Sequence, residues 1–207
     1  MNTNNLKLST FLFFFLALTS FSKAQSEYKV GDLALDFNLK NVNGKMISLA
    51  KFKQAKGFIV VFTCNHCPYA KAYESRIMAL NAEYAAKGFP VIAINPNDPI
   101  AYPEDAFEEM QKRAKEKKYT FPYLIDETQS VAKAYGARVT PHVYLLKKTE
   151  MGLEVAYIGA IDNDTENINP NRINYVAPAI EDLLVGKSPS IVQTKAIGCA
   201  IKWKESY

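Results

Sequence analysis

Residues 57–73 read GFIVVFTCNHCPYAKAY and carry the clearest structural signal of the chain. Its apolar run, residues 58–62, predicts a central strand that is covered on both faces, as in a βαβ unit. Pro68 marks the start of a helix, because proline is favoured at the first helical position, where its missing N–H costs nothing. We predict that this helix covers residues 68–87 and ends at Gly88. A buried strand therefore delivers two cysteines to the start of a helix.

These two cysteines, in the order Cys64-Asn65-His66-Cys67, have the placement of a redox pair. A thiol is nucleophilic as the thiolate, and the amides of a helix N-terminus lower its pKa from about 8.5 towards roughly 3.5–7.5. Cys67 precedes Pro68, so we predict that it is the N-cap residue. A protonated His66 would stabilise a neighbouring thiolate and make the disulfide form more oxidising. A Cys-x-x-Cys beside a βαβ unit is typical of a redox dithiol.

Four segments of the chain resemble the thioredoxin superfamily, in its peroxiredoxin-like or redoxin branch, the alkyl hydroperoxide reductase/thiol-specific antioxidant group. Residues 30–49 resemble that group's entry hairpin, residues 64–67 a redox motif, and Thr140-Pro141 the cis-proline of the superfamily. Residues 198–203, Gly-Cys-Ala-Ile-Lys-Trp, resemble the tail of uncharacterised members of the group. The resemblance implies an α/β thioredoxin-like fold with a central mixed sheet, helices on both faces, an N-terminal hairpin and a C-terminal tail.

The same resemblance implies a cis peptide bond at Pro141 that abuts the redox cysteines, and a substrate-binding role for Thr140, whose backbone would hold a bound peptide. It leaves the attacking cysteine open. Counted from the aromatic Phe62, Cys67 matches the attacking cysteine of thioredoxin. Matched by motif alone, residues 64–67 resemble the CxHC of disulfide isomerases, in which the first cysteine attacks and the second resolves. The position of the proline favours Cys67 as the thiol of lower pKa.

The third cysteine, Cys199, lies in the tail and has two interpretations. It is either a small buried hydrophobic residue that anchors the tail, or a third thiol that resolves a mixed disulfide on Cys67 or Cys64. Its distance from the motif decides between the two. The second histidine, His142, follows the proline at a predicted strand start, where a core or hydrogen-bonded role is favoured over that of a ligand.

The length and composition limit the classes of function. A chain of 207 residues, after a short leader, suits one domain with a sizeable core. A formal net charge of +4 gives no case for binding nucleic acid. Three cysteines, two of them in one tight motif, do not form the disulfide framework of a small secreted scaffold.

The first residues predict a secretory signal peptide, residues 1–24. Lys7 gives a positive start, residues 11–18 form an apolar stretch too short to span a bilayer, and residues 22–24, Ser-Lys-Ala, form a cleavage site. We therefore expect a thioredoxin-like (redoxin) domain over residues 25–207. It would be secreted across the inner membrane, periplasmic if the source is bacterial, with no stable membrane anchor after cleavage. An uncleaved anchor is the alternative.

Alternation, turn residues and helix ends predict the other elements. They are a hairpin over residues 35–49 that turns at Asn43-Gly44 and lies at one edge, strands at 90–95, 123–125 and 142–146, a hairpin over 147–159, a surface loop at 161–174, and helices opening at Pro103 and covering 126–135 and 175–185. In the helix that opens at Pro103, Glu104 and Asp105 would complement the helix dipole from the first turn.

We infer from these features a thiol-disulfide oxidoreductase that acts on protein thiols and disulfides outside the cytosol, together with a reducing or oxidising redox partner. One thiolate of the motif attacks a partner disulfide and the other motif cysteine releases the mixed disulfide. His66 sets the redox poise, and no organic cofactor or metal is required.

Three alternatives remain. A thiol peroxidase with antioxidant activity fits the redoxin-like hairpin and an exposed thiol at a helix start. A Cu(I)-binding metal chaperone fits the soft ligands Cys64, His66 and Cys67, with His142 as a fourth ligand, because Cu(I) favours thiolates. A binding domain that keeps the fold without redox activity is the third.

Overall fold

The computed structural model describes residues 27–205, which are built around an eight-stranded mixed sheet. The predicted signal peptide, residues 1–24, lies outside the described residues. The strands, in the order in which they lie side by side, are β1 (Leu33–Ala34), β9 (Gly152–Gly159), β8 (His142–Thr149), β4 (Gly57–Phe62), β5 (Val91–Asn95), β6 (Tyr123–Ile125), β2 (Leu39–Asn41) and β3 (Met46–Ile47). A second, two-stranded sheet joins β7 (Val139–Thr140) to β10 (Cys199–Ala200).

Strand β4 lies at the centre of the large sheet and is buried along its whole length. It pairs in parallel with β5 on one side and antiparallel with β8 on the other, so its backbone is satisfied on both edges. Ile59 and Val61 pack into the hydrophobic cluster on one face of the sheet, and Phe58, Val60 and Phe62 into the cluster on the other. This explains why the strand is apolar at successive positions, as predicted.

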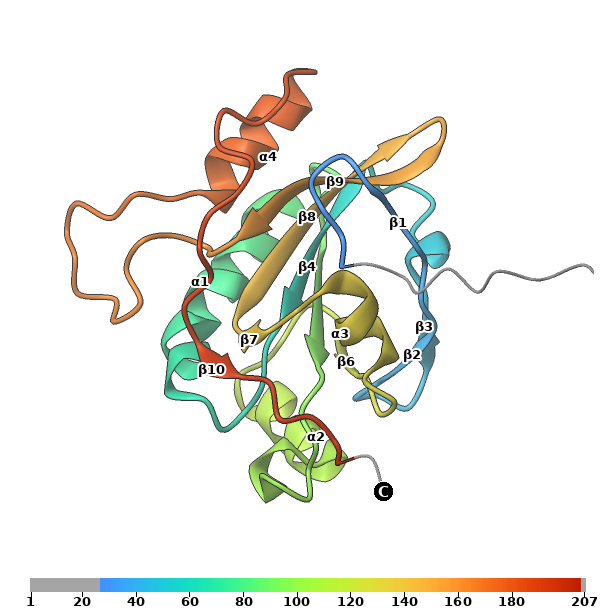
Figure 1. Cartoon of the computed structure of the whole chain (residues 1–207), viewed down its shortest axis with the longest axis vertical. Coiled ribbons are helices and arrows are strands. Elements are labelled where there is room, and N and C mark those ends of the chain that lie inside the picture. Colours follow the sequence, from blue (N-terminus) through green and yellow to red (C-terminus); the bar gives the residue numbers. More distant parts are fainter. Residues whose placement is uncertain (1–26, 206–207) are drawn as a thin grey trace, which may run out of the picture.

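Helices cover both faces of the sheet, which confirms the predicted α/β architecture (Figure 1). Apolar side chains of three helices pack on the face of Ile59: α1 (Pro68–Tyr84), α2 (Phe107–Glu116) and α4 (Val176–Leu184). The other face is covered by α3 (Ser130–Tyr135) and by the N-terminal segment, through Tyr135, Tyr28 and Phe37. The hairpin β2–β3 lies at one edge of the sheet, as predicted.

Helix α1 begins where the sequence predicts and ends one turn early. Cys67 is its N-cap residue and Pro68 its first residue. After Tyr84 the chain leaves the helix through a turn closed by the bond from the Phe89 amide to the Tyr84 carbonyl (2.9 Å), with Gly88 in a left-handed conformation. Among helices of the described part of the chain, none has the length and apolar character that a membrane span needs.

The predicted helix at Pro103 begins later than expected, and this changes the role of Asp105. Pro103–Asp105 form a separate 3-10 turn, and the extended residue Ala106 divides it from α2, whose first-turn acids are Glu108 and Glu109. Asp105 is fully buried and does not lie in the first turn of α2. The helix predicted over residues 126–135 likewise begins only at Ser130.

Candidate redox site

The two motif cysteines and the tail cysteine Cys199, which follows Cys67 by 132 residues, meet beside the proline of the Thr140-Pro141 peptide. That peptide bond is cis, as the family resemblance implies. Strand β4 and helix α1 position Cys64 and Cys67, and β10 brings Cys199 to β7, the strand that holds Thr140. Cys64 and Cys67 form a small buried cluster against which Cys199 packs.

Cys67 is joined to Cys199 by a disulfide, with the two Cα atoms 6.0 Å apart. The Cys67 side chain is fully buried, and its sulfur lies 3.3 Å from the Thr140 carbonyl oxygen. In this oxidised state the sulfur makes no capping hydrogen bond to the amides of α1. Of the two interpretations of Cys199, the structure therefore places it in contact with the motif, bonded to Cys67.

Cys64 is the free thiol of this state and is also buried, with 5% of its surface exposed. Its sulfur lies 3.1 Å from the Thr140 hydroxyl oxygen. Burial, and then the negative charge of Asp105, raise the pKa of Cys64 to about 11. The thiol therefore keeps its proton near neutral pH. That Cys67 is the thiol of lower pKa stays a prediction. Neither motif sulfur is exposed, contrary to the exposed thiol on which the peroxidase alternative relied.

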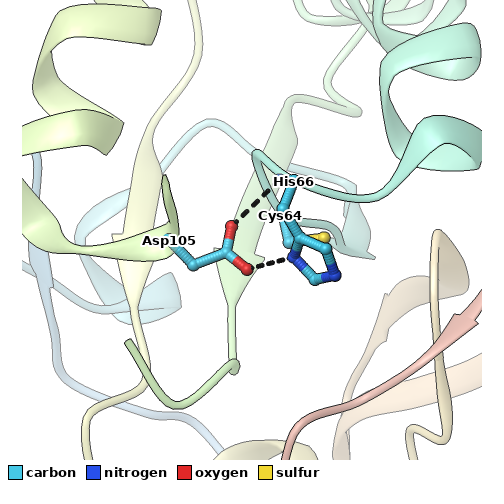
Figure 2. Close-up of side chains that lie close together, drawn as sticks. All are labelled: Cys64, His66 and Asp105. Carbon is cyan, nitrogen blue, oxygen red and sulfur yellow. Dashed lines mark hydrogen bonds and ion pairs between the residues drawn. The ribbon is translucent and has the colours of Figure 1, made fainter. Parts of the chain in front are cut away.

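His66 is held by Asp105, as Figure 2 shows. The ring nitrogen Nδ1 lies 2.5 Å from Asp105 Oδ2, and the ring stacks on Tyr102 with centroids 3.9 Å apart. The backbone amides of Asn65 and His66 donate to the other carboxylate oxygen at 2.6 and 3.3 Å, and the Asn97 side chain donates to Oδ2 at 2.8 Å. Asp105 thus fixes both the backbone of the motif and the orientation of the imidazole.

Asp105 is the residue of the site that sequence analysis misses. It lies 40 and 39 residues from the two motif amides it binds, those of Asn65 and His66, and its position after Pro103 and Glu104 looks like that of an ordinary helix-start acid. No local sequence signal marks it, because the break at Ala106 that separates Asp105 from α2 is seen only in the structure.

A metal would find three donors close together in this site. One ligand atom each from Cys64, His66 and Asp105 lies within 4.8 Å of the others. Both Asp105 oxygens already accept hydrogen bonds, so a metal would have to displace them. Among the described residues, His142, the fourth ligand of the copper alternative, does not belong to this group of donors. Cys67, another ligand of that alternative, is in a disulfide.

His142 lies on β8 outside the motif. Its Nδ1 atom is buried without a hydrogen-bond partner, and its ring contacts Tyr144 at 4.8 Å between centroids. Burial, and then the nearby Arg138, lower the pKa of His142 to about 4. The ring is therefore neutral at physiological pH, and it lies partly buried at the start of β8 rather than in a ligand set.

Comparison with known proteins identifies the family. Residues 30–156, more than half of the chain, match the AhpC/TSA family. The chain belongs to the AhpC/TSA family. This confirms the resemblance to the redoxin branch of the thioredoxin superfamily, which the cis-proline and the motif at the start of α1 support in structural terms.

Two curated relatives are named thiol-disulfide oxidoreductases. The chain is 27% identical over 130 residues to thiol-disulfide oxidoreductase ResA of Halalkalibacterium halodurans, covering 63% of this chain and 69% of that protein. It is 26% identical over 132 residues to ResA of Geobacillus thermodenitrificans, covering 62% and 70%. Family and relatives together establish the chain as an oxidoreductase of the thiol-disulfide class.

Two solved structures resemble nearly the whole chain. An uncharacterised conserved protein of Geobacillus kaustophilus is 38% identical with a TM-score of 0.79, over 86% of this chain and 94% of that one. A hypothetical protein of Sinorhizobium meliloti is 34% identical with a TM-score of 0.80, over 87% and 97%. The similarity to these two proteins extends beyond the residues of the family match.

Proposed function

We propose that the protein exchanges disulfides with partner proteins at Cys67, and that it works outside the cytosol. The observation that carries the proposal is the oxidised state itself. Cys67, at the start of α1 and beside the cis-proline, is covalently joined to a second cysteine that a different element supplies. The N-cap position is where a thiolate gains stabilisation from the helix dipole once the disulfide is reduced.

The exchange proceeds in two displacements. The Cys67 thiolate attacks one sulfur of a partner disulfide, so a mixed disulfide forms and the other partner sulfur leaves as a thiolate. A second cysteine of this chain then attacks the Cys67 sulfur and expels the partner's first sulfur as a thiolate. The partner gains two electrons and this protein loses them. If the disulfide of this protein is more oxidising than that of its partner, and the partner is a dithiol, the same steps run in reverse.

Two cysteines compete for the second displacement. The disulfide between Cys67 and Cys199 supports Cys199 as the attacking residue, because attack by Cys199 on the Cys67 sulfur yields this disulfide. Cys64 is the motif's own resolving cysteine, and it must first lose the proton that its raised pKa retains. His66, held by Asp105, is the proposed group that tunes the pair. Thr140 and Pro141 form the proposed substrate-binding edge, because both motif sulfurs lie against Thr140.

The proposed location rests on the leader at residues 1–24. Export would place the thiols in a compartment where disulfides form and persist, so a redox partner would have to reduce or oxidise them after each turnover. The mass of the protein recovered from fractionated cells tests this. A mature chain that begins at Gln25 and is found with the exported fraction supports the proposal, and a full-length cytosolic chain refutes it.

Transfer of electrons to a protein disulfide tests the activity. Reduced protein is mixed with disulfide-bonded insulin, and the thiols that appear on insulin are counted. We expect Cys67→Ser to slow the transfer by at least about a hundredfold, since the nucleophile is lost. Cys64→Ser serves as the matched cysteine-to-serine control and should keep measurable transfer through Cys199. Equal transfer by Cys67→Ser and the wild type would refute exchange at Cys67.

A thiol peroxidase is the second candidate, and the bond between a helix-start cysteine and a tail cysteine favours it. In that reaction hydroperoxide oxidises Cys67 to a sulfenic acid, and Cys199 condenses with it, releasing water and forming the disulfide. Peroxidatic enzymes of this group carry Thr or Ser three residues before that cysteine, where this chain has Cys64. In the double variant Cys64→Ser, Cys199→Ser, where no second cysteine can condense with it, stoichiometric peroxide should leave a sulfenic acid on Cys67 within seconds. Absence of that sulfenic acid would exclude the reaction.

A further inference from the structure

We propose that the tail occupies the position in which a segment of a substrate protein, the client, binds beside Cys67, and we call this position the seat. We further propose that clients of this enzyme bind through extended segments with glycine immediately before the reactive cysteine. The proposal rests on the proposed exchange at Cys67 and adds the class of substrate. It starts from the pairing of β10 with β7. Cys199 lies opposite Thr140, and Ala200 opposite Val139, in an antiparallel ladder. The tail therefore presents a cysteine to Cys67 in the form of a short strand.

Gly198 shows what this seat selects. A Cβ atom at this position would lie 2.2 Å from the carbonyl oxygen of Thr140, 2.6 Å from its carbonyl carbon and 3.1 Å from the nitrogen of Pro141. All three are backbone atoms next to the cis peptide, so they cannot move aside as a flexible side chain would. Ala200, on the other side of the cysteine, is exposed. The seat thus excludes a side chain before the cysteine and tolerates one after it.

The tail is anchored on both sides of this seat, so residues 195–200 form a strap (Figure 1). On one side the Thr194 amide donates to the Ile158 carbonyl at 3.0 Å. On the other side the Ile201 amide donates to the Arg138 carbonyl at 3.0 Å, and the Lys202 carbonyl accepts from the Gln129 side chain at 2.7 Å. Between the anchors, the strap is held by the β10–β7 pair and by the disulfide.

This arrangement makes the strap a competitor of the client. With the strap in place the Cys67 side chain is fully buried, so a client cannot reach its sulfur. A dithiol donor first reduces the disulfide: the donor becomes a disulfide, and Cys67 and Cys199 become thiols. The client segment then pairs with β7 in place of β10, and the Cys67 thiolate attacks its disulfide. When the strap returns, Cys199 attacks Cys67 and expels the client sulfur as a thiolate.

A peptide with the sequence of residues 195–201 tests the seat. Its cysteine carries thionitrobenzoate in a mixed disulfide, so attack by the protein releases a coloured thiolate. The protein is the double variant Cys64→Ser, Cys199→Ser, in which Cys67 is the remaining cysteine. We expect the peptide with valine in place of its glycine to react at least about tenfold more slowly, because of the backbone clash. The control peptide, with valine in place of the alanine after the cysteine, should react within about twofold of the original.

The outcomes separate this inference from the proposed function. Equal rates for the two valine peptides would refute the proposed selection for glycine at the seat. Reaction of Cys67 with glutathione disulfide would still support exchange at Cys67. If Cys67 reacts with neither the peptides nor glutathione disulfide, the exchange itself fails, and the inference with it. In the full chain, Gly198→Val should slow formation of the Cys67–Cys199 disulfide and Ala200→Val should not. Equal rates in these two variants would also refute this selection for glycine.

Discussion

Cys64 and Cys67 are three positions apart in the chain and have different chemical settings. Cys67 is the N-cap residue of α1, where the dipole favours a thiolate. Cys64 lies before the helix, buried beside the carboxylate of Asp105, which disfavours a second negative charge. The proline after Cys67 made the first setting predictable, because it marks a local structure. The second depends on Asp105, which arrives from a distant turn, and no local pattern predicts it.

Alkylation of Cys64 tests its raised pKa. In the oxidised protein, the rate of reaction with iodoacetamide should stay low at pH 8 and rise with pH towards a midpoint near 11, because the thiolate reacts. Asp105→Asn should lower that midpoint, since it removes a charge that raises the pKa. Glu104→Gln, which changes the exposed neighbouring acid, should leave it unchanged. A midpoint near 9 in the wild type would contradict the buried setting.

His142 predicts a loss of stability in acid. Its folded-state pKa of about 4 lies below the ordinary value of 6.5, so the folded protein favours the neutral ring. The contribution of the neutral ring to the free energy of unfolding is complete above about pH 6.5. As the pH falls towards 4, the free energy of unfolding decreases by up to roughly 3 kcal/mol. Urea unfolding at pH 7.5 and pH 4.5 measures it. His142→Gln should lose clearly less stability between these pH values than the wild type, and equal losses would contradict the prediction.

At the scale of elements, sequence patterns predict what neighbouring residues determine. The strand β4, the start of α1 and the hairpin β8–β9 lie where the patterns place them. The 3-10 turn at Pro103 and the pairing of β10 with β7 were not predicted. Both depend on contacts between distant segments: Asp105 with the motif, and Cys199 with Cys67, 132 residues away. A two-residue strand such as β10 also leaves no periodicity to detect.

Hydrogen exchange tests whether the strap is held as described. Reduction of the disulfide removes the covalent link and leaves the two-residue ladder, so amides of residues 197–200 should exchange faster. Amides of the anchors, at Thr194 and Ile201, should keep their protection because their hydrogen bonds do not involve the disulfide. Unchanged exchange of the strap after reduction, with Cys67 shown to be a thiol, would contradict this account.

At the scale of the whole molecule, the tail up to residue 205 packs at the end of the fold that holds the redox motif. The chain crosses from α4 past α1 to β7 and then continues towards α2 (Figure 1). The Lys202 carbonyl accepts from the Asp98 amide at 2.9 Å, in the same connection that leads to Asp105. The α/β class was predictable because the redoxin-like segments imply it and the apolar run of β4 agrees with a covered central strand. The packing of the tail against β7 was not predictable, since it depends on strands that come together only in the folded protein.

The disulfide between the tail and Cys67 predicts a redox-dependent stability. Because Cys67 and Cys199 enclose a long loop, the disulfide restricts the unfolded chain, and reduction should lower the free energy of unfolding by about 2–5 kcal/mol. Urea unfolding of oxidised and reduced protein measures this difference. The double variant Cys64→Ser, Cys199→Ser is the control, because Cys67 then has no cysteine to pair with and the stability should not respond to reductant. A wild type that is equally stable in both states would count against the disulfide.

The most direct test of exchange at Cys67 is a redox titration of the chain from Gln25 across a glutathione gradient, with disulfides mapped by mass spectrometry. We predict a reversible two-electron transition in which Cys67 belongs to the disulfide and Cys199 is its partner. The midpoint then gives the direction of electron flow. Oxidation that leaves Cys67 as a free thiol, or the absence of any disulfide across the gradient, would contradict the central claim.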